Sequence, residues 1–283
     1  MIRSGSITAL FFLILFAFQA QNGKSQEVLD GAYIDEHEKT RQVIRHPHLR
    51  QADVMWEKRV WRVIDNKQKI NLPLYYPVKE IKDRKSLWQV IVENLSEGSI
   101  TAYRSGPSNN VDDFSEGTYQ WAAFKKEVIV DSCYNSRMDT MIPNPTKSRD
   151  IYRYRLKEVW YFDKQRSVMD VKIIGLAPFL YTDKACASSN SREAVGRMFW
   201  LYFPECRYVF QNYEAFNQVG GNKAEMRSFD DIFIKRRFNS FLVKESNVYD
   251  RSIRDYKSNM DALLESKRIK NEMFRIEHDL WSY

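Results

Sequence analysis

The stretch "VWYFDKQRSVMDVKIIGLAP", Val159 to Pro178, decides the fold that this sequence predicts. Apolar and charged side chains alternate strictly from Met169 to Ile173, which is the period of a half-buried strand. The preceding arm instead carries four consecutive bulky apolar residues, Val159 to Phe162, before the polar residues 163–167. The stretch therefore predicts an antiparallel hairpin in which only one arm has a clearly solvated face.

Phe162 and Val168 flank the five polar residues of the loop, and pairing them places Glu158 opposite Lys172. In this register Trp160 and Phe162 lie on the opposite face, beside a charged residue of the returning arm. We expect a neighbouring element or a second subunit to cover part of that face. Trp160 and Phe162 are therefore candidate interface residues.

Helical periodicity precedes this central region. In "DVMWEKRVWRVID", residues 53–65, four apolar side chains fall on one stripe, so the stretch predicts an amphipathic helix. A second helix is predicted from about Ser86, with Gly98 just beyond its end, because glycine readily terminates helices. "SITAY", residues 99–103, then predicts a short strand.

The C-terminal part also predicts helices. Ser228 is a suitable N-cap, with Asp230 and Asp231 in the first turn, where the helix dipole favours acids. The apolar face of this helix is expected to continue as far as Leu242. A last helix runs almost to Tyr283, and its apolar side chains have helical spacing: Ile269, Met273, Ile276 and Leu280.

Strands are predicted in the middle of the chain, at Val128–Val130, in the hairpin and in the aromatic stretch "RMFWLYFP", residues 197–204. Large rings and β-branched side chains favour strands because they pack well on a pleated, half-buried surface. Strands in the middle and helices at both ends predict an α+β fold. We expect a central antiparallel, aromatic-rich sheet with helices from the N- and C-terminal parts packed around it.

The N-terminus predicts three regions. Residues 1–20 read as a signal peptide, because Arg3 precedes a run of twelve residues, Ile7–Phe18, in which only Thr8 is polar. Residues 21–50 lack a sustained apolar period and are predicted to form an extended arm. Residues 51–283 are predicted to form the α+β domain. The expected mature chain has no transmembrane segment, since the apolar run is shorter than a spanning helix.

Charge and cysteines exclude several classes of protein. Without Arg3, 43 basic residues face 37 acidic ones, and this excess is spread along the chain, which argues against nucleic-acid binding. In an oxidising compartment the three cysteines allow at most one internal disulfide. Cys186 and Cys206 are favoured over Cys133 as its partners, although the sequence leaves the bridge open.

No catalytic, cofactor-binding or metal-binding residues are predicted. The ten glycines form none of the phosphate-cradling motifs, and the histidines have no partner at a catalytic spacing. His46 and His48 could ligate a metal, but this spacing in an exposed arm is more typical of ordinary surface. A carboxylate pair of a glycosidase is defined in space and cannot be found from spacing alone.

Five segments carry a resemblance to a known family: "WEKRVWRVIDNKQKINLPLYYP", "KSLWQVIVENL…GSITAY", "VWYFDKQRSVMDVKIIGLAP", "FDDIFIKRRFNSFLVKESNVYDR" and "EHDLWSY". They span residues 51–283 in order, and the chain resembles the gliding motility protein GldN family of Bacteroidetes. The resemblance implies a non-catalytic structural subunit of a periplasmic ring in the type IX secretion system. It also implies two kinds of partner, an outer-membrane lipoprotein and other copies of the chain.

A ring subunit needs two complementary surfaces, because head-to-tail association closes only when each copy offers both. The arm supplies three apolar candidates for such contacts, Val43, Ile44 and Leu49. They join Trp160 and Phe162 as the predicted interface residues.

The alternative is a secreted carbohydrate-active enzyme or sugar-binding protein. It is favoured by the aromatic content, since 14% of the residues are Phe, Trp or Tyr, and by the expected export. Buried or interface aromatics are the commoner explanation for such content. The localisation that the ring hypothesis implies is the periplasm, at the inner face of the outer membrane through a partner.

Overall fold

The computed structural model describes residues 41–81, 84–105, 114–135, 140–183, 192–197, 199–215 and 227–281. The predicted signal peptide, residues 21–40 of the predicted arm and Cys186 lie outside the described residues. Residues 41–50 carry no helix or strand, and Lys39–Tyr283 form one compact unit. The boundaries at residues 20 and 50 stay predictions.

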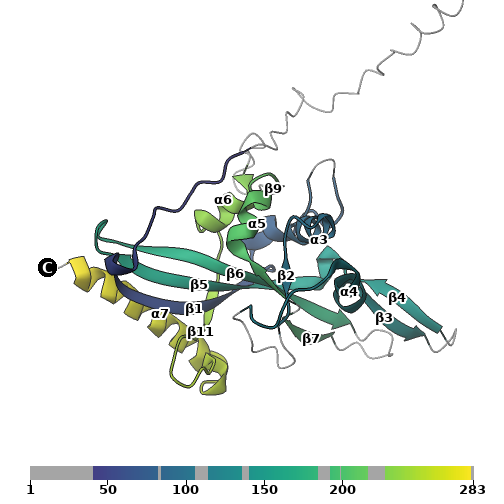
Figure 1. Ribbon diagram of the computed structural model, residues 1–283. Coiled ribbons are helices and arrows are strands. Elements are labelled where there is room, and N and C mark those ends of the chain that lie inside the picture. The colour runs from purple at the N-terminus through teal and green to yellow at the C-terminus, as the bar shows by residue number, and fades with distance from the viewer. Residues whose placement is uncertain are drawn as a thin grey trace, which may run out of the picture. The chain divides into compact units, whose positions relative to one another are not determined.

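An antiparallel sheet of seven strands forms the centre of this unit (Figure 1). Six strands lie in the order β11-β1-β5-β6-β8-β2, and β7 pairs with the far end of β6. The strands are β1 (Val54–Asp65), β2 (Ala102–Tyr103), β5 (Ile151–Asp163), β6 (Val168–Asp183), β7 (Arg192–Arg197), β8 (Trp200–Tyr202) and β11 (Phe241–Glu245). The predicted α+β fold with a central antiparallel, aromatic-rich sheet is confirmed.

Helices and two small strand pairs surround the sheet. The helices are α2 (Leu72–Tyr75), α3 (Leu87–Glu97), α4 (Trp121–Phe124), α5 (Phe203–Phe210), α6 (Phe229–Ile234) and α7 (Asn259–Trp281). Short helical turns are η1 (Gln51–Asp53), η2 (Lys69–Asn71), η3 (Lys125–Ile129), η4 (Ser148–Asp150) and η5 (Ile253–Asp255). The small pairs are β3 (Val130–Asn135) with β4 (Thr140–Pro145), and β9 (Glu214–Ala215) with β10 (Arg227–Ser228).

The predicted helix over residues 53–65 is wrong, because Val54–Asp65 form strand β1 between β5 and β11. Val60 packs beside Leu242 of β11, whereas Trp61 packs against Trp200 on the opposite face of the sheet. A helix buries one stripe, whereas this segment has apolar cover on both sides. Its Val and Trp residues suit a central strand, and the helical spacing of the apolar residues was coincidental.

The hairpin between β5 and β6 is confirmed, but the predicted register is wrong by one residue. Asp163 pairs with Val168, and Phe162 faces Met169 across a four-residue turn, 164–167. Asp163 stays in the strand because its carboxylate Oδ1 accepts a hydrogen bond of 2.9 Å from the backbone N–H of Gln165. This side-chain cap closes the turn one residue earlier than a loop of five would.

The helix predicted from Ser86 is confirmed as α3. Ser86 is its N-cap, the Gln89 side chain accepts from the Ser86 N–H at 2.9 Å, and the two residues form a capping box. Gly98 ends the helix with φ of 77°, a left-handed conformation that glycine adopts without a steric cost. β2 confirms the short strand predicted at residues 99–103.

Ser228 is the N-cap of α6 as predicted, but the helix ends at Ile234 and does not continue to Leu242. Arg236 has a φ of 51°, so the chain turns there, and β11 then pairs with β1. The apolar residues beyond the turn are buried as strand residues. The last predicted helix is confirmed as α7, whose Ile269 and Met273 are buried.

Two predicted strands are displaced. Residues 125–129 continue α4 as a π turn, so the strand predicted at Val128–Val130 begins only at Val130. In the segment 197–204, β8 ends at Tyr202 and α5 begins at Phe203, followed directly by Pro204. Proline suits the first turn of a helix because the first N–H groups have no partner within the helix.

The core divides between the two faces of the sheet. On one face, the largest cluster joins β5 and β6 to α3, α5 and α6, and a smaller cluster joins β1 and β11 to α7. On the other face, Trp61 and Trp200 pack together with Ala177. Gly175 of β6 permits this packing, because a Cβ there would lie 3.0 Å from the Trp200 ring.

Candidate interaction surfaces

The five predicted interface residues differ in exposure. Ile44 is 62% exposed, whereas Val43, Leu49 and Trp160 are half-buried and Phe162 is only 4% exposed. Phe162 is thus part of the interior of the single chain. A contact between any of the five and another subunit stays a prediction.

Trp160 belongs to a buried polar network on β5. Its indole N–H donates to Glu158 Oε2 at 3.0 Å, and it packs at the edge of the cluster that α7 covers. Arg236 donates to both oxygens of Glu158 at 3.0 and 3.3 Å, and its guanidinium lies 5.2 Å from the centre of a Trp160 ring. Glu158 is fully buried. The network therefore joins the turn after α6 to the sheet.

A basic groove lies between residues 41–46 and helix α5, with a volume of about 540 Å³. We define it by its lining residues: Arg41, Gln42, Val43, Arg45, His46, Pro204, Arg207, Tyr208 and Asn212. One wall is a segment without secondary structure, and the other is α5 with the turn after it. Two parts of the chain some 160 residues apart thus form one surface feature.

Arg207 anchors the two walls of the basic groove to each other. It forms a two-point ion pair with Asp230 of α6, at 2.9 and 3.1 Å, and its Nη2 also donates to the Ile44 carbonyl at 2.6 Å. Both charged side chains are buried. Burial raises the pKa of Asp230 above its ordinary value, although the hydrogen bonds from Arg207 act in the opposite direction.

The net charge of the basic groove comes from Arg41 and Arg45, since Asp230 neutralises Arg207. Neither Arg41 nor Arg45 has an ion-pair partner among the residues that the structure describes. Burial lowers the pKa of His46 below 6.5, and the nearby Arg207 and Lys172 lower it further. At neutral pH, His46 is uncharged and the groove presents two guanidinium groups, which suit carboxylates.

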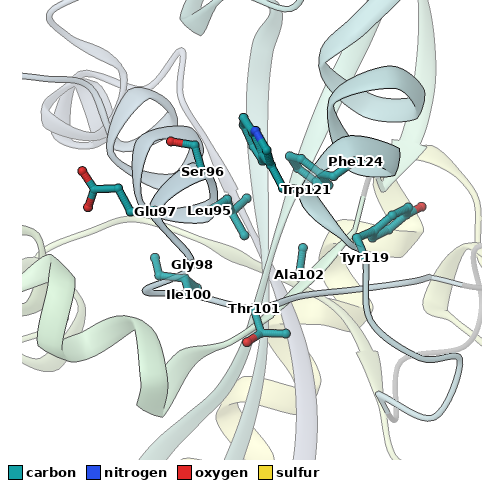
Figure 2. Close-up of a pocket in the computed structure, with 10 residues that line it drawn as sticks. All are labelled: Leu95, Ser96, Glu97, Gly98, Ile100, Thr101, Ala102, Tyr119, Trp121 and Phe124. Atoms are coloured by element: carbon teal, nitrogen blue, oxygen red, sulfur yellow. The ribbon is translucent and has the colours of Figure 1, made fainter.

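A second, aromatic pocket of about 300 Å³ lies at the C-terminal end of α3 (Figure 2). Trp121 and Phe124 stack with ring centres 5.9 Å apart, and Tyr119 meets Phe124 edge to face at 5.6 Å. Leu95 and Ile100 also line the pocket. This aromatic pocket suits one apolar side chain, and Glu97 is the one carboxylate in its lining.

Helix α7 carries a third surface feature, an apolar stripe on its solvent side. The stripe consists of residues more than half exposed: Met260, Leu263, Leu264 and Phe274. Exposed apolar groups that lie together on one element are typical of contact surfaces.

No group of three His, Cys, Asp or Glu residues that could hold a metal occurs in the described part of the chain. Cys206 is a free, fully buried thiol, and burial raises its pKa well above the ordinary value. The sequence left open a bridge between Cys206 and Cys186, and Cys186 lies outside the described residues. Among the described residues, no helix is long and apolar enough to cross a membrane.

Sequence reasoning missed both pockets. Arg207 and Ile44 meet across 163 positions, and nothing in the local pattern of either segment signals the contact. The aromatic pocket had a signal, since Tyr119, Trp121 and Phe124 lie within six residues of one another. That density of rings beside a helix end is the pattern that could have indicated it.

Comparisons with known proteins identify the family. No curated protein matches the chain significantly. The family model described as gliding motility associated protein GldN matches residues 49–282, a range that includes every helix and strand in the described part of the chain. The chain therefore belongs to the GldN family, and it is a component of the machinery of gliding motility and type IX secretion.

Proposed function

We propose that this protein is a non-catalytic structural subunit of a periplasmic ring in the type IX secretion and gliding motility machinery. In that ring it contacts other copies of itself and an outer-membrane lipoprotein, which holds it at the inner face of the outer membrane. The observation that carries the proposal is the GldN match over residues 49–282, because it extends over most of the α+β unit and not over one motif.

The surface supports an assembly role. A head-to-tail ring needs at least two different patches on each subunit. The basic groove, the aromatic pocket and the apolar stripe of α7 are distinct in chemistry, and each is built from different elements. One is charged and two are apolar, which suits contacts with more than one partner.

Co-purification tests this proposal. The full chain is co-expressed with the lipoprotein encoded in the same secretion system, extracted in mild detergent and sized by light scattering. We expect a large complex with a constant ratio of the two proteins. Recovery of only the monomeric chain, free of the lipoprotein in every gentle condition, would contradict the ring.

The aromatic pocket favours the second candidate, a sugar-binding protein. Half-buried Trp121 borders a pocket about the size of one sugar ring's binding site. Titration of soluble glycans, followed by tryptophan fluorescence, tests this function with Trp121→Ala as the matched variant. A saturable signal that Trp121→Ala abolishes would support sugar binding over the purely structural role.

A further inference from the structure

We propose that the basic groove holds the acidic segment 27–38 of a neighbouring copy of this chain. The inference deepens the proposed function and rests on its self-assembly, because it names the segment and the surface through which two copies meet. It follows from the charge, the apolar lining and the position of the basic groove.

The positive charge of the basic groove favours binding of an anionic group. Arg41 and Arg45 line it, and neither has a partner among the described residues. Arg207 is already neutralised by Asp230, so it anchors the wall and contributes little net attraction. Two unpaired guanidinium groups that line one groove favour carboxylates, which each of them can bind with two parallel hydrogen bonds.

The segment 27–38, "EVLDGAYIDEHE", has the matching charge. It contains no Lys or Arg, and its five carboxylates are Glu27, Asp30, Asp35, Glu36 and Glu38. The chain changes sign abruptly after it, because Arg41, Arg45 and Arg50 follow. Each copy therefore carries both halves of the proposed contact, the acidic segment and the basic groove.

Apolar side chains match as well. The basic groove includes Val43, Pro204 and Tyr208, and the Tyr208 ring is 69% exposed. In the acidic segment, Tyr33 and Ile34 directly precede Asp35 and Glu36. Tyr33 and Ile34 can therefore pack on Tyr208 while the carboxylates that follow them reach Arg41 and Arg45.

The turn chemistry favours a neighbouring copy over the same chain. Residues 41–46 form one wall of the basic groove, so the preceding segment can enter it in cis only by reversing within residues 38–41, "EKTR". This tetrapeptide contains no Gly, Pro, Asn or Asp, the residues that tight turns prefer. Twelve extended residues reach up to about 40 Å, enough to cross to an adjacent subunit.

Binding of a synthetic peptide tests the pairing. A fluorescent peptide of residues 27–38 is titrated against the mature full chain at low salt, beside a peptide with all five carboxylates changed to amides. We expect saturable binding that weakens as salt rises and is at least tenfold weaker for the amide peptide. The variant Arg41→Ser/Arg45→Ser should lose a similar factor.

The control variant Lys267→Ser/Lys270→Ser removes the same charge from exposed positions on α7. It should bind the peptide as the unmodified chain does. Equal loss in both variants, equal binding of the two peptides, or binding of anionic phospholipid vesicles but not of the peptide would each overturn the proposal.

Complementation separates a neighbouring copy from the same chain. One tagged chain carries the arginine changes with its acidic segment intact, and another carries the five amide changes with its basic groove intact. We expect the two to associate when mixed, and each to associate with itself at least tenfold less. No mixed complex despite peptide binding would place the segment in its own groove, whereas an intact lipoprotein complex with no peptide binding would refute this inference alone.

Discussion

Two arginine–carboxylate pairs with buried carboxylates anchor different kinds of structure in this protein. Arg236 and Glu158 join the turn after α6 to the central strand β5, which is paired along its length. Arg207 and Asp230 join two helices, and the same arginine holds a segment without secondary structure through the Ile44 carbonyl. The Arg236–Glu158 pair thus stabilises the core, whereas the Arg207–Asp230 pair positions the arginine that binds residues 41–50.

The difference lies in what else holds each region. Around Glu158, ladder hydrogen bonds and the apolar cluster under α7 also stabilise the chain. For residues 41–50, the hydrogen bond from Arg207 to the Ile44 carbonyl is the one hydrogen bond to α5 among the described residues. Loss of the first pair should therefore affect global stability, whereas loss of the second should also release a segment.

The largest expected effect is that of Glu158→Leu. The change leaves Arg236 without its carboxylate and the Trp160 indole N–H without its acceptor, and should lower the free energy of unfolding by about 3–5 kcal/mol. Urea denaturation measures it. Glu57→Ala, at an exposed position of β1, is the control and should change stability by less than about 0.5 kcal/mol.

Asp230→Ala should have a smaller but compound effect. It leaves Arg207 buried without a counter-charge and should lower the free energy of unfolding by about 3 kcal/mol. It also removes the ion pair that orients Arg207 toward the Ile44 carbonyl. Trypsin cleavage after Arg45 and Arg50 should become faster at temperatures where the chain stays folded. Unchanged cleavage would show that the segment is held by something other than Arg207. Glu158→Leu is the comparison, and it should leave the rate of cleavage in the folded state unaltered.

Trp160→Ala sharpens the distinction between core and interface. The ring is half-buried, so its loss should cost about 2–3 kcal/mol in the isolated chain, somewhat below the usual range for a fully buried aromatic. Trp160→Phe keeps most of the packing but removes the hydrogen bond to Glu158, and should cost about 1 kcal/mol. If thermal melts of the isolated chain show no change for Trp160→Ala, the ring serves an interface and not the core.

The smallest expected effect is a pH dependence at His46. Its pKa is lowered in the folded chain, mainly by burial and then by Arg207 and Lys172, while Asp170 and Asp230 act in the opposite direction. Below pH 6.5 the released segment therefore binds more protons than the attached one, so attachment weakens as pH falls and is constant above that value. Hydrogen exchange of residues 41–50 should quicken on acidification, and His46→Asn should flatten the response. An equal response in His46→Asn would assign it to another group.

Local patterns predicted those elements whose signals lie within a few positions of one another. The Ser86–Gln89 capping box and Gly98 delimit α3, and the period of Ile269 and Met273 identifies α7. The residues 53–65 were misread because the same spacing of apolar residues fits a helical stripe and a strand buried on both faces. Which of the two applies depends on β5 and β11, which lie far away in the sequence.

The candidate surfaces were predictable only in part for the same reason. Val43 and Ile44 were predicted as apolar interface residues. Val43 lines the basic groove, and the Ile44 carbonyl accepts a hydrogen bond from Arg207. The other wall, on α5, could not be inferred, because residues 197–204 were predicted as a strand and no helix was predicted at Phe203–Phe210. Phe162 was expected at an interface, but the fold of the single chain already buries it.

By itself the sequence determined the caps of α3 and α6, the hairpin, the long last helix and the family to which the chain belongs. Tertiary structure decided the strand at β1, the one-residue register of the hairpin and the meeting of Arg207 with Ile44. Caps and periodicity act between residues about four positions apart, so they can be read locally. Burial on both faces of β1 and the hydrogen bond between Arg207 and Ile44 depend on partners far away in the sequence, so neighbouring residues do not signal them.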